Sequence, residues 1–294
     1  MKKLTIILFG ALLTSPVLAE KVDQTQDVEA DGRVDIYNMS GSIEIIGWDR
    51  NQVNVSGEIG DDVEELFFEV NGSHTEIKVK IPNRSHGHKD VSADIVVRVP
   101  AASSIDVGSV SSDIDIEDVT GEQDVQSVSG DITTMVFAAD VDIETVSGDV
   151  NADGNNSDSE TKLESVSGDV TADGLTGELR IGTVSGDLDV TDGDFDRTKA
   201  ETVNGDISFV AALRSGGKLD FETVNGTVDV GLVGDVGAKI EVETFNGRIR
   251  NCFGPEPERT SRYTPGWELS FTEGDGDGRI SIATLNGGVK LCKD

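Results

Sequence analysis

Hydrophobic and polar residues alternate in short runs over residues 105–292, and most of these runs end at a Ser-Gly or Asn-Gly pair. Val146-Ser147-Gly148-Asp149-Val150 is a clear copy of this motif. A two-residue period is typical of a β-strand with one buried face. We number the corner residue of each copy as position zero; these residues are Ser112, Gly130, Gly148, Gly168, Gly186, Gly205, Gly226, Gly247 and Gly287, with an outlying copy at Gly41.

The corners recur at intervals of 18, 18, 20, 18, 19, 21, 21 and 40 residues. Short strands separated by bends at a nearly constant interval indicate a parallel β-solenoid with one rung per repeat. The blades of a β-propeller need about 40 residues or more. A meander of antiparallel hairpins is the other alternative, but it would not require the same residue type at each corner. At ~4.8 Å per rung, nine rungs would form a rod of about 40 Å.

Positions −7 and −5, and again +2 and +4, are in phase with one buried strand face. Position −2 is apolar in every copy but out of phase with −5, so we expect a bend between them. A second bend is expected at the glycine, where positive φ or close backbone approach is easiest. The pattern therefore predicts an all-β fold: a single-stranded parallel β-helix of about nine rungs over residues 101–294, with a right-handed coil. Residues 20–100 are expected to form an N-terminal β-strand cap region over the open end of the stack.

Two polar columns support stacking. Position −3 carries a hydroxyl in every solenoid copy, as at Thr145 and Ser165. Position −1 is Ser in the early copies and Asn in the late ones, from Asn204 onward. Stacked Asn amides can hydrogen-bond to one another along the axis. Because the change occurs in contiguous blocks, neighbouring copies are expected to be in contact.

The two cysteines, Cys252 and Cys292, both occupy position +5 of their copies. Equivalent positions in adjacent rungs lie ~4.8 Å apart, within the Cα separation that a disulfide accepts. We therefore predict a Cys252–Cys292 disulfide, with two free thiols as the alternative. The 40-residue interval then corresponds to a last rung that carries an insertion within residues 253–277.

Residues 1–19 have the features of a bacterial secretory signal peptide: Lys2 and Lys3, a short apolar run, and small residues before Glu20. Their removal changes the formal net charge from −32 to −34. Such a surface disfavours binding to nucleic acid and anionic lipid. We expect a periplasmic, secreted or cell-surface protein of a bacterium, with no membrane insertion after cleavage and with oxidising conditions that permit the disulfide.

An Asp column at position +1 is the main candidate for a site, and it comprises Asp113, Asp131, Asp149, Asp169, Asp187 and Asp206. The column has two interpretations: solvated carboxylates that form local backbone hydrogen bonds, or ligands of Ca²⁺, which favours clustered carboxylate and carbonyl oxygens. Calcium is the one cofactor that the sequence suggests. A lyase would also need a nearby base, for which rungs 131–190 offer Lys162 and Arg180 alone.

Glutamates at position −4, such as Glu144 and Glu164, form a second acidic edge. All three histidines, His74, His86 and His88, precede the repeats, so no Ser-His-Asp triad can form on the rungs. His86 and His88 are too few to predict a metal site. No catalytic residue is predicted.

The recurrent Thr-Val-Ser-Gly-Asp-Val motif, seen at 145–150, resembles a bacterial putative-adhesin family with β-strand repeats. Gly41-Ser42-Ile43-Glu44-Ile45 followed by Gly47-Trp48-Asp49, and the strand 93–100, are also similar to that family. The resemblance covers most of the mature chain. It implies a β-helical envelope protein of unknown function and brings no catalytic residues.

The sequence favours a non-enzymatic exported β-helix, acting as an adhesin-like binding module or envelope scaffold for an envelope or extracellular glycan or protein ligand. The alternative is a calcium-dependent polysaccharide-active β-helix enzyme that uses the Asp column. A third hypothesis is a structural protein that assembles end to end.

Overall fold

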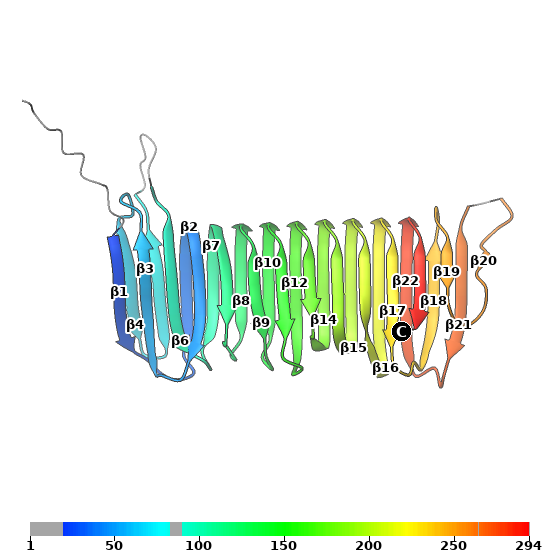
Figure 1. The fold of residues 1–294 in the computed structure, drawn as a ribbon, viewed down its shortest axis with the longest axis horizontal. Coiled ribbons are helices and arrows are strands. Elements are labelled where there is room, and N and C mark those ends of the chain that lie inside the picture. Colours follow the sequence, from blue (N-terminus) through cyan, green and yellow to red (C-terminus); the bar gives the residue numbers. More distant parts are fainter. Residues whose placement is uncertain (1–19, 83–89, 264, 294) are drawn as a thin grey trace, which may run out of the picture.

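The computed structural model describes residues 20–82, 90–263 and 265–293, and in these ranges all regular secondary structure is β-strand. The strands lie side by side across the long axis of a rod (Figure 1). Their bounds are β1 (Glu20–Asp27), β2 (Arg33–Trp48), β3 (Gln52–Ile59), β4 (Glu65–Asn71), β5 (His74–Lys80), β6 (Ala93–Pro100), β7 (Ser104–Glu117), β8 (Gln123–Ser129), β9 (Ile132–Val136), β10 (Val141–Ser147), β11 (Val150–Gly154), β12 (Asp158–Ser167), β13 (Val170–Asp173), β14 (Thr176–Ser185), β15 (Leu188–Asn204), β16 (Ile207–Asn225), β17 (Val228–Val233), β18 (Ala238–Thr244), β19 (Ile249–Asn251), β20 (Glu258–Arg259), β21 (Trp267–Glu273), β22 (Gly278–Asn286) and β23 (Val289–Lys293).

In the middle of the rod, each repeat pairs in parallel with the next at matching positions. Ile143 of β10 lies opposite Val125 of β8 on one side and Leu163 of β12 on the other. After the corner, β11 pairs in the same way with β9 and β13. One repeat therefore forms one rung, as the spacing predicts, and the architecture is solenoid-like.

The core is a narrow column of aliphatic side chains from positions −7, −5, +2 and +4. Ile143, Leu163 and Val150 are fully buried. Toward the C-terminal part, Phe209 packs between the rings of Phe195 and Phe221 at centroid distances of 5.9 and 5.0 Å. Each buried side chain meets its counterparts in the adjacent rungs, so the core depends on register throughout.

The expected bend between positions −5 and −2 is wrong. The strand continues straight to the corner, so position −3 points inward and position −2 points outward. Most of the buried −3 hydroxyls donate to the carbonyl oxygen of a corner glycine in an adjacent rung: Thr183 Oγ1 donates to Gly168 O at 3.1 Å and Thr202 Oγ1 to Gly186 O at 3.3 Å. This hydrogen bond lets a polar residue occupy a buried column.

Close backbone approach explains the corner glycines. A Cβ atom at Gly168 would lie 2.0 Å from Gly148 O, and one at Gly186 would lie 2.0 Å from Gly168 O. Among the described corner glycines, only Gly41 and Gly130 have a positive φ. Glycine is therefore required mainly because the next rung leaves no room for a side chain, and less because of its conformational freedom.

At the N-terminal end, chain order and spatial order differ. β2 pairs in parallel with β7 on one side and with β5 and β6 on the other. Gly41 lies opposite Ser112, so the outlying copy of the motif joins the stack. Beyond β2, antiparallel pairing of β3 with β6, β1 with β3, and β4 with β5 closes the end.

The C-terminal end has a similar arrangement. β22 and β23 pair in parallel with β16 and β17 on one side and with β18 and β19 on the other. The last repeat in the chain therefore lies between the two repeats that precede it, and the C-terminus lies beside β17 rather than at the tip (Figure 1). The prediction that this repeat forms the last rung of the stack is wrong, because the outermost rung is the one formed by β18 and β19.

The insertion supplies a cap for this outermost rung. β21 pairs antiparallel with β18, and β20 pairs antiparallel with β21. The predicted Cys252–Cys292 disulfide is present, with a Cα–Cα distance of 4.8 Å. It joins the chain's last repeat to the outermost rung.

Candidate binding groove

The Asp column runs along the corners as a hydrogen-bond ladder. Asp149 Oδ1 accepts the backbone N–H of Asp169 at 2.9 Å, and Asp169 Oδ1 accepts that of Asp187 at 2.8 Å. The same bond occurs from Asp113 to Asp131, Asp131 to Asp149, Asp187 to Asp206, and Asp206 to Thr227. Each carboxylate therefore binds the next rung. Within the described ranges, no group of three or more His, Cys, Asp or Glu side chains has an arrangement that could hold a metal ion.

The late Asn residues form the amide ladder that their position predicts. Asn225 Nδ2 donates to Asn204 Oδ1 at 2.8 Å, and Asn286 Nδ2 donates to Asn225 Oδ1 at 2.9 Å. Asn246 Nδ2 completes the ladder by donating to Asn286 Oδ1 at 2.9 Å. The order of these bonds follows the spatial order of the rungs and not the order of the chain.

The outward side chains at position −2 form a continuous apolar row, which we call the valine row. The exposed fraction of each of these residues lies between 38% and 49%. In spatial order the row consists of Val110, Val128, Val146, Val166, Val184, Val203, Val224, Leu285 and Phe245. The sequence pattern shows that position −2 is apolar in every copy, but the bend expected between positions −5 and −2 does not predict an exposed row. The buried hydroxyl at −3 was the missed signal, because strict alternation then requires −2 to face solvent.

A long groove follows the valine row. One part has a volume of about 780 Å³ and runs from Tyr37 and Met39 to Val184. The second part has a volume of about 680 Å³ and continues to Phe245 and Trp267. Both parts are lined by Thr183 and Glu201, so they form one groove along the rod.

Aromatic residues lie at both ends of the groove, each with a cation over its ring. Lys78 Nζ is 5.5 Å from the centroid of the Tyr37 ring at the N-terminal end. At the C-terminal end, Arg259 lies 4.8 Å from the centroid of the Trp267 ring. Cation–π contacts of this kind hold half-buried rings in place.

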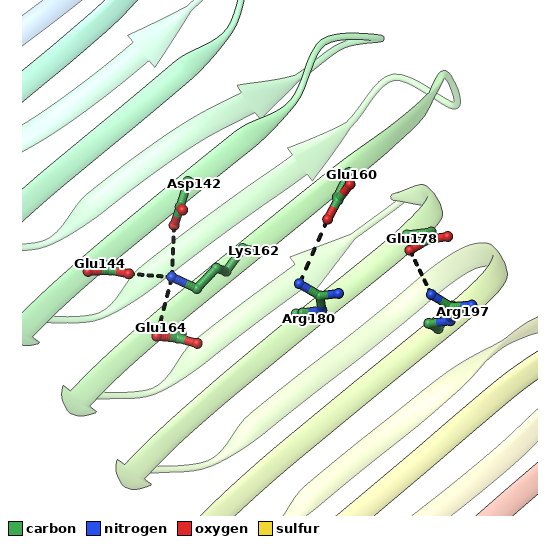
Figure 2. A network of polar contacts seen from close by, with 8 residues as sticks. All are labelled: Asp142, Glu144, Glu160, Lys162, Glu164, Glu178, Arg180 and Arg197. Carbon is green, nitrogen blue, oxygen red and sulfur yellow. Dashed lines mark hydrogen bonds and ion pairs between the residues drawn. The ribbon is translucent and has the colours of Figure 1, made fainter.

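Position −4 forms the side of the groove opposite the valine row. Lys162 lies among the acidic side chains there, with its ammonium directed at Asp142, Glu144 and Glu164 (Figure 2). Partial burial opposes protonation of Lys162, but hydrogen bonds to Glu144 and Asp142 outweigh it and raise the pKa above its usual range. Arg180–Glu160 and Arg197–Glu178 ion pairs continue this charged surface at 3.8 and 3.4 Å (Figure 2).

A family model described as Toastrack DUF4097 matches residues 32–292. The chain belongs to the Toastrack DUF4097 family. This Toastrack chain is also similar to solved structures. One is a putative lipid binding protein from Parabacteroides distasonis ATCC 8503, at 12% identity and a TM-score of 0.52, covering 92% of this chain and 96% of that one. Another is a putative adhesin from Bacteroides fragilis NCTC 9343, at 11% identity and a TM-score of 0.45, covering 92% and 97%. A search of curated proteins finds no match.

The Toastrack chain does not assemble its candidate bases into a site. Lys162 and Arg180 are both engaged in ion pairs with glutamates. His74 lies in the N-terminal part, where its Nε2 contacts Asp35 Oδ2 at 2.8 Å. His86, His88 and the predicted signal peptide lie outside the described residues. In the described ranges, no segment forms a helix with the length and hydrophobicity needed to cross a bilayer.

Proposed function

We propose that this protein is an exported, non-enzymatic binding module of the bacterial envelope, periplasmic or at the cell surface. Its repeats would form a right-handed solenoid of about nine rungs that presents the valine row to an extended ligand. The rod is the scaffold in this proposal, and the groove is the working surface.

The continuous exposure of the valine row is the observation that carries the proposal. Soluble proteins rarely expose large contiguous apolar patches, and those that exist are often binding sites. Threonine or another polar β-former at position −2 would preserve the strand and remove the exposed apolar surface. Stability of the stack alone therefore does not account for an apolar residue in every rung.

The similar structure with a TM-score of 0.52 bears the name of a lipid binding protein, which is compatible with an apolar ligand. The resemblance of the Thr-Val-Ser-Gly-Asp-Val motif to a putative-adhesin family also favours binding over catalysis. In addition, the candidate catalytic bases Lys162 and Arg180 are neutralised by glutamates.

Binding of the neutral fluorescent probe N-phenyl-1-naphthylamine to the exported protein tests the proposal. We expect a saturable rise in fluorescence that is lost in the Val146→Asp/Val166→Asp double variant, because two charges would enter the groove. Met135→Asp is the matched control, because Met135 is 38% exposed but does not line the groove. Equal binding of the probe by both variants, or no binding by the wild type, would refute a groove function. Circular dichroism and thermal melting would verify that each variant is folded.

A further inference from the structure

The two halves of the groove differ in charge. In the N-terminal half, position −4 carries the uncharged Gly108 and Gln126. The next two members of this column, Glu144 and Glu164, share Lys162 with Asp142. In the C-terminal half, Glu222 and Glu243 line the groove and make no ion pair within the part of the chain that the structure describes. The first rungs of the groove, at Gly108 and Gln126, therefore carry no charge at position −4, whereas the C-terminal half is acidic.

Lys78 provides a cation at the N-terminal end of the groove, next to the uncharged rungs. It is an exposed residue of β5, lies over Tyr37 and lines the groove. It makes no ion pair among the described residues, and the neighbouring Glu76 does not line the groove. An anionic group at this end would therefore meet a free ammonium, and an apolar chain attached to it would lie along the valine row.

The dimensions select a thin ligand. This part of the groove has a volume of about 780 Å³ and extends from β5 to β15. Spread over seven spacings of ~4.8 Å, the volume corresponds to a mean cross-section of roughly 23 Å². An α-helix with a diameter of about 10 Å needs roughly 80 Å². An extended peptide is also disfavoured, because its backbone N–H and C=O groups would enter an apolar groove without partners. A hydrocarbon chain has no such groups.

The length of the groove also fits a hydrocarbon chain. With C–C bonds of about 1.52 Å at tetrahedral angles, a sixteen-carbon chain extends about 19 Å. This corresponds to about four rung spacings. A carboxylate at Lys78 on β5 would place the far end of the chain next to Val146 on β10, within the N-terminal half of the groove.

We propose that the ligand is a long-chain carboxylate, a monomeric fatty acid whose head group binds Lys78 and whose chain lies along Val110, Val128 and Val146. This inference rests on the proposed function of the groove and adds the ligand class and its orientation. A membrane surface is a poorer occupant, because the formal net charge of −32 repels anionic lipid.

The test is displacement of N-phenyl-1-naphthylamine from the exported protein by hexadecanoate, below the concentration at which hexadecanoate forms micelles. We expect hexadecanoate to displace the probe about two- to fivefold more effectively than hexadecan-1-ol, the range that one exposed ion pair supplies. Lys78→Glu should abolish this preference, because it replaces the ammonium at the head-group end with a carboxylate. Lys78→Arg should retain the preference, because it keeps the positive charge.

The outcomes separate the two proposals. If the probe binds but hexadecanoate does not displace it, or Lys78→Glu leaves the preference intact, the fatty-acid inference fails and the groove function stands. Tighter binding of hexadecyltrimethylammonium than of hexadecanoate would assign the ligand to the acidic half and overturn the inference. Binding only to phosphatidylglycerol vesicles would replace the monomeric ligand with a membrane surface. If the probe itself does not bind, the groove function fails.

Discussion

The middle of the rod and its two ends are built by different rules. From β8 to β17, the chain visits the rungs in order, and the same side chain recurs at each position of the parallel stack. At both ends the chain instead places a repeat one position inward: β2 lies between β7 and β5–β6, and β22 lies between β16 and β18. Antiparallel strands then cover the outermost rungs.

This difference shows what each region contributes. The middle is stabilised by repetition, so each rung depends on the fit of the next. The ends have no next rung, and an open edge would be a template for association with another chain. Inward placement and antiparallel caps limit that exposure and make end-to-end assembly a less favourable hypothesis.

The largest effect is expected in the middle. Gly186→Ala would place a Cβ atom 2.0 Å from Gly168 O, so the rungs must separate. We expect a loss of more than about 3 kcal/mol in the free energy of unfolding, or failure to fold. Gly182→Ala is the control, because its Cβ atom would lie 3.5 Å from Glu201 O. Urea unfolding measures both, and similar stabilities would contradict the close-approach explanation.

The disulfide should affect one end. The Cys252→Ser/Cys292→Ser double variant loses a cross-link over a sequence separation of 40. The chain-entropy model predicts a loss of about 4 kcal/mol in the free energy of unfolding. Engineered disulfides often contribute less than this model predicts. Hydrogen exchange should accelerate in β19 and β23 before it does in β10–β12. Uniform acceleration along the rod would show that the end is not an independent unit.

The hydroxyl column offers a comparison within the middle. Thr183→Val removes the hydrogen bond to Gly168 O and should cost about 1 kcal/mol. Thr145 occupies the same column, but its buried Oγ1 has no hydrogen-bond partner. Thr145→Val should therefore be neutral or stabilising. Thermal melting compares the two, and an equal loss in both would argue that the hydroxyl does not act through the glycine carbonyl.

The smallest effect concerns charge near the N-terminal end. Burial raises the pKa of Asp124, and the charges of Asp106 and Asp142 raise it further. Because ionised Asp124 is disfavoured in the folded state, Asp124→Asn should raise the melting temperature at pH 7 by less than Thr183→Val lowers it. The advantage should shrink as the pH falls through the raised pKa toward 3.8, where the wild-type carboxyl also becomes neutral. A difference that persists at pH 3.5 would assign the effect to packing.

Much of the middle could be predicted from sequence, because the period, the Asn ladder and the phase of Cys252 and Cys292 are local signals that repeat. The order of the end rungs could not be predicted. The repeats that contain Gly247 and Gly287 would have equivalent neighbours whichever of the two is outermost. The outward direction of Val146 could not be predicted, because the bend expected between positions −5 and −2 interrupts the strand alternation that directs position −2 toward solvent. The groove was missed for the same reason.

A crystal structure of the protein with 16-bromohexadecanoate would test the claim that the valine row is a binding surface most directly. The anomalous signal of bromine locates the end of the chain without any assumption about the ligand's position. We predict one bromine site in the groove beside Val146 or Val166. Bromine elsewhere on the rod, with none in the groove, would contradict the claim.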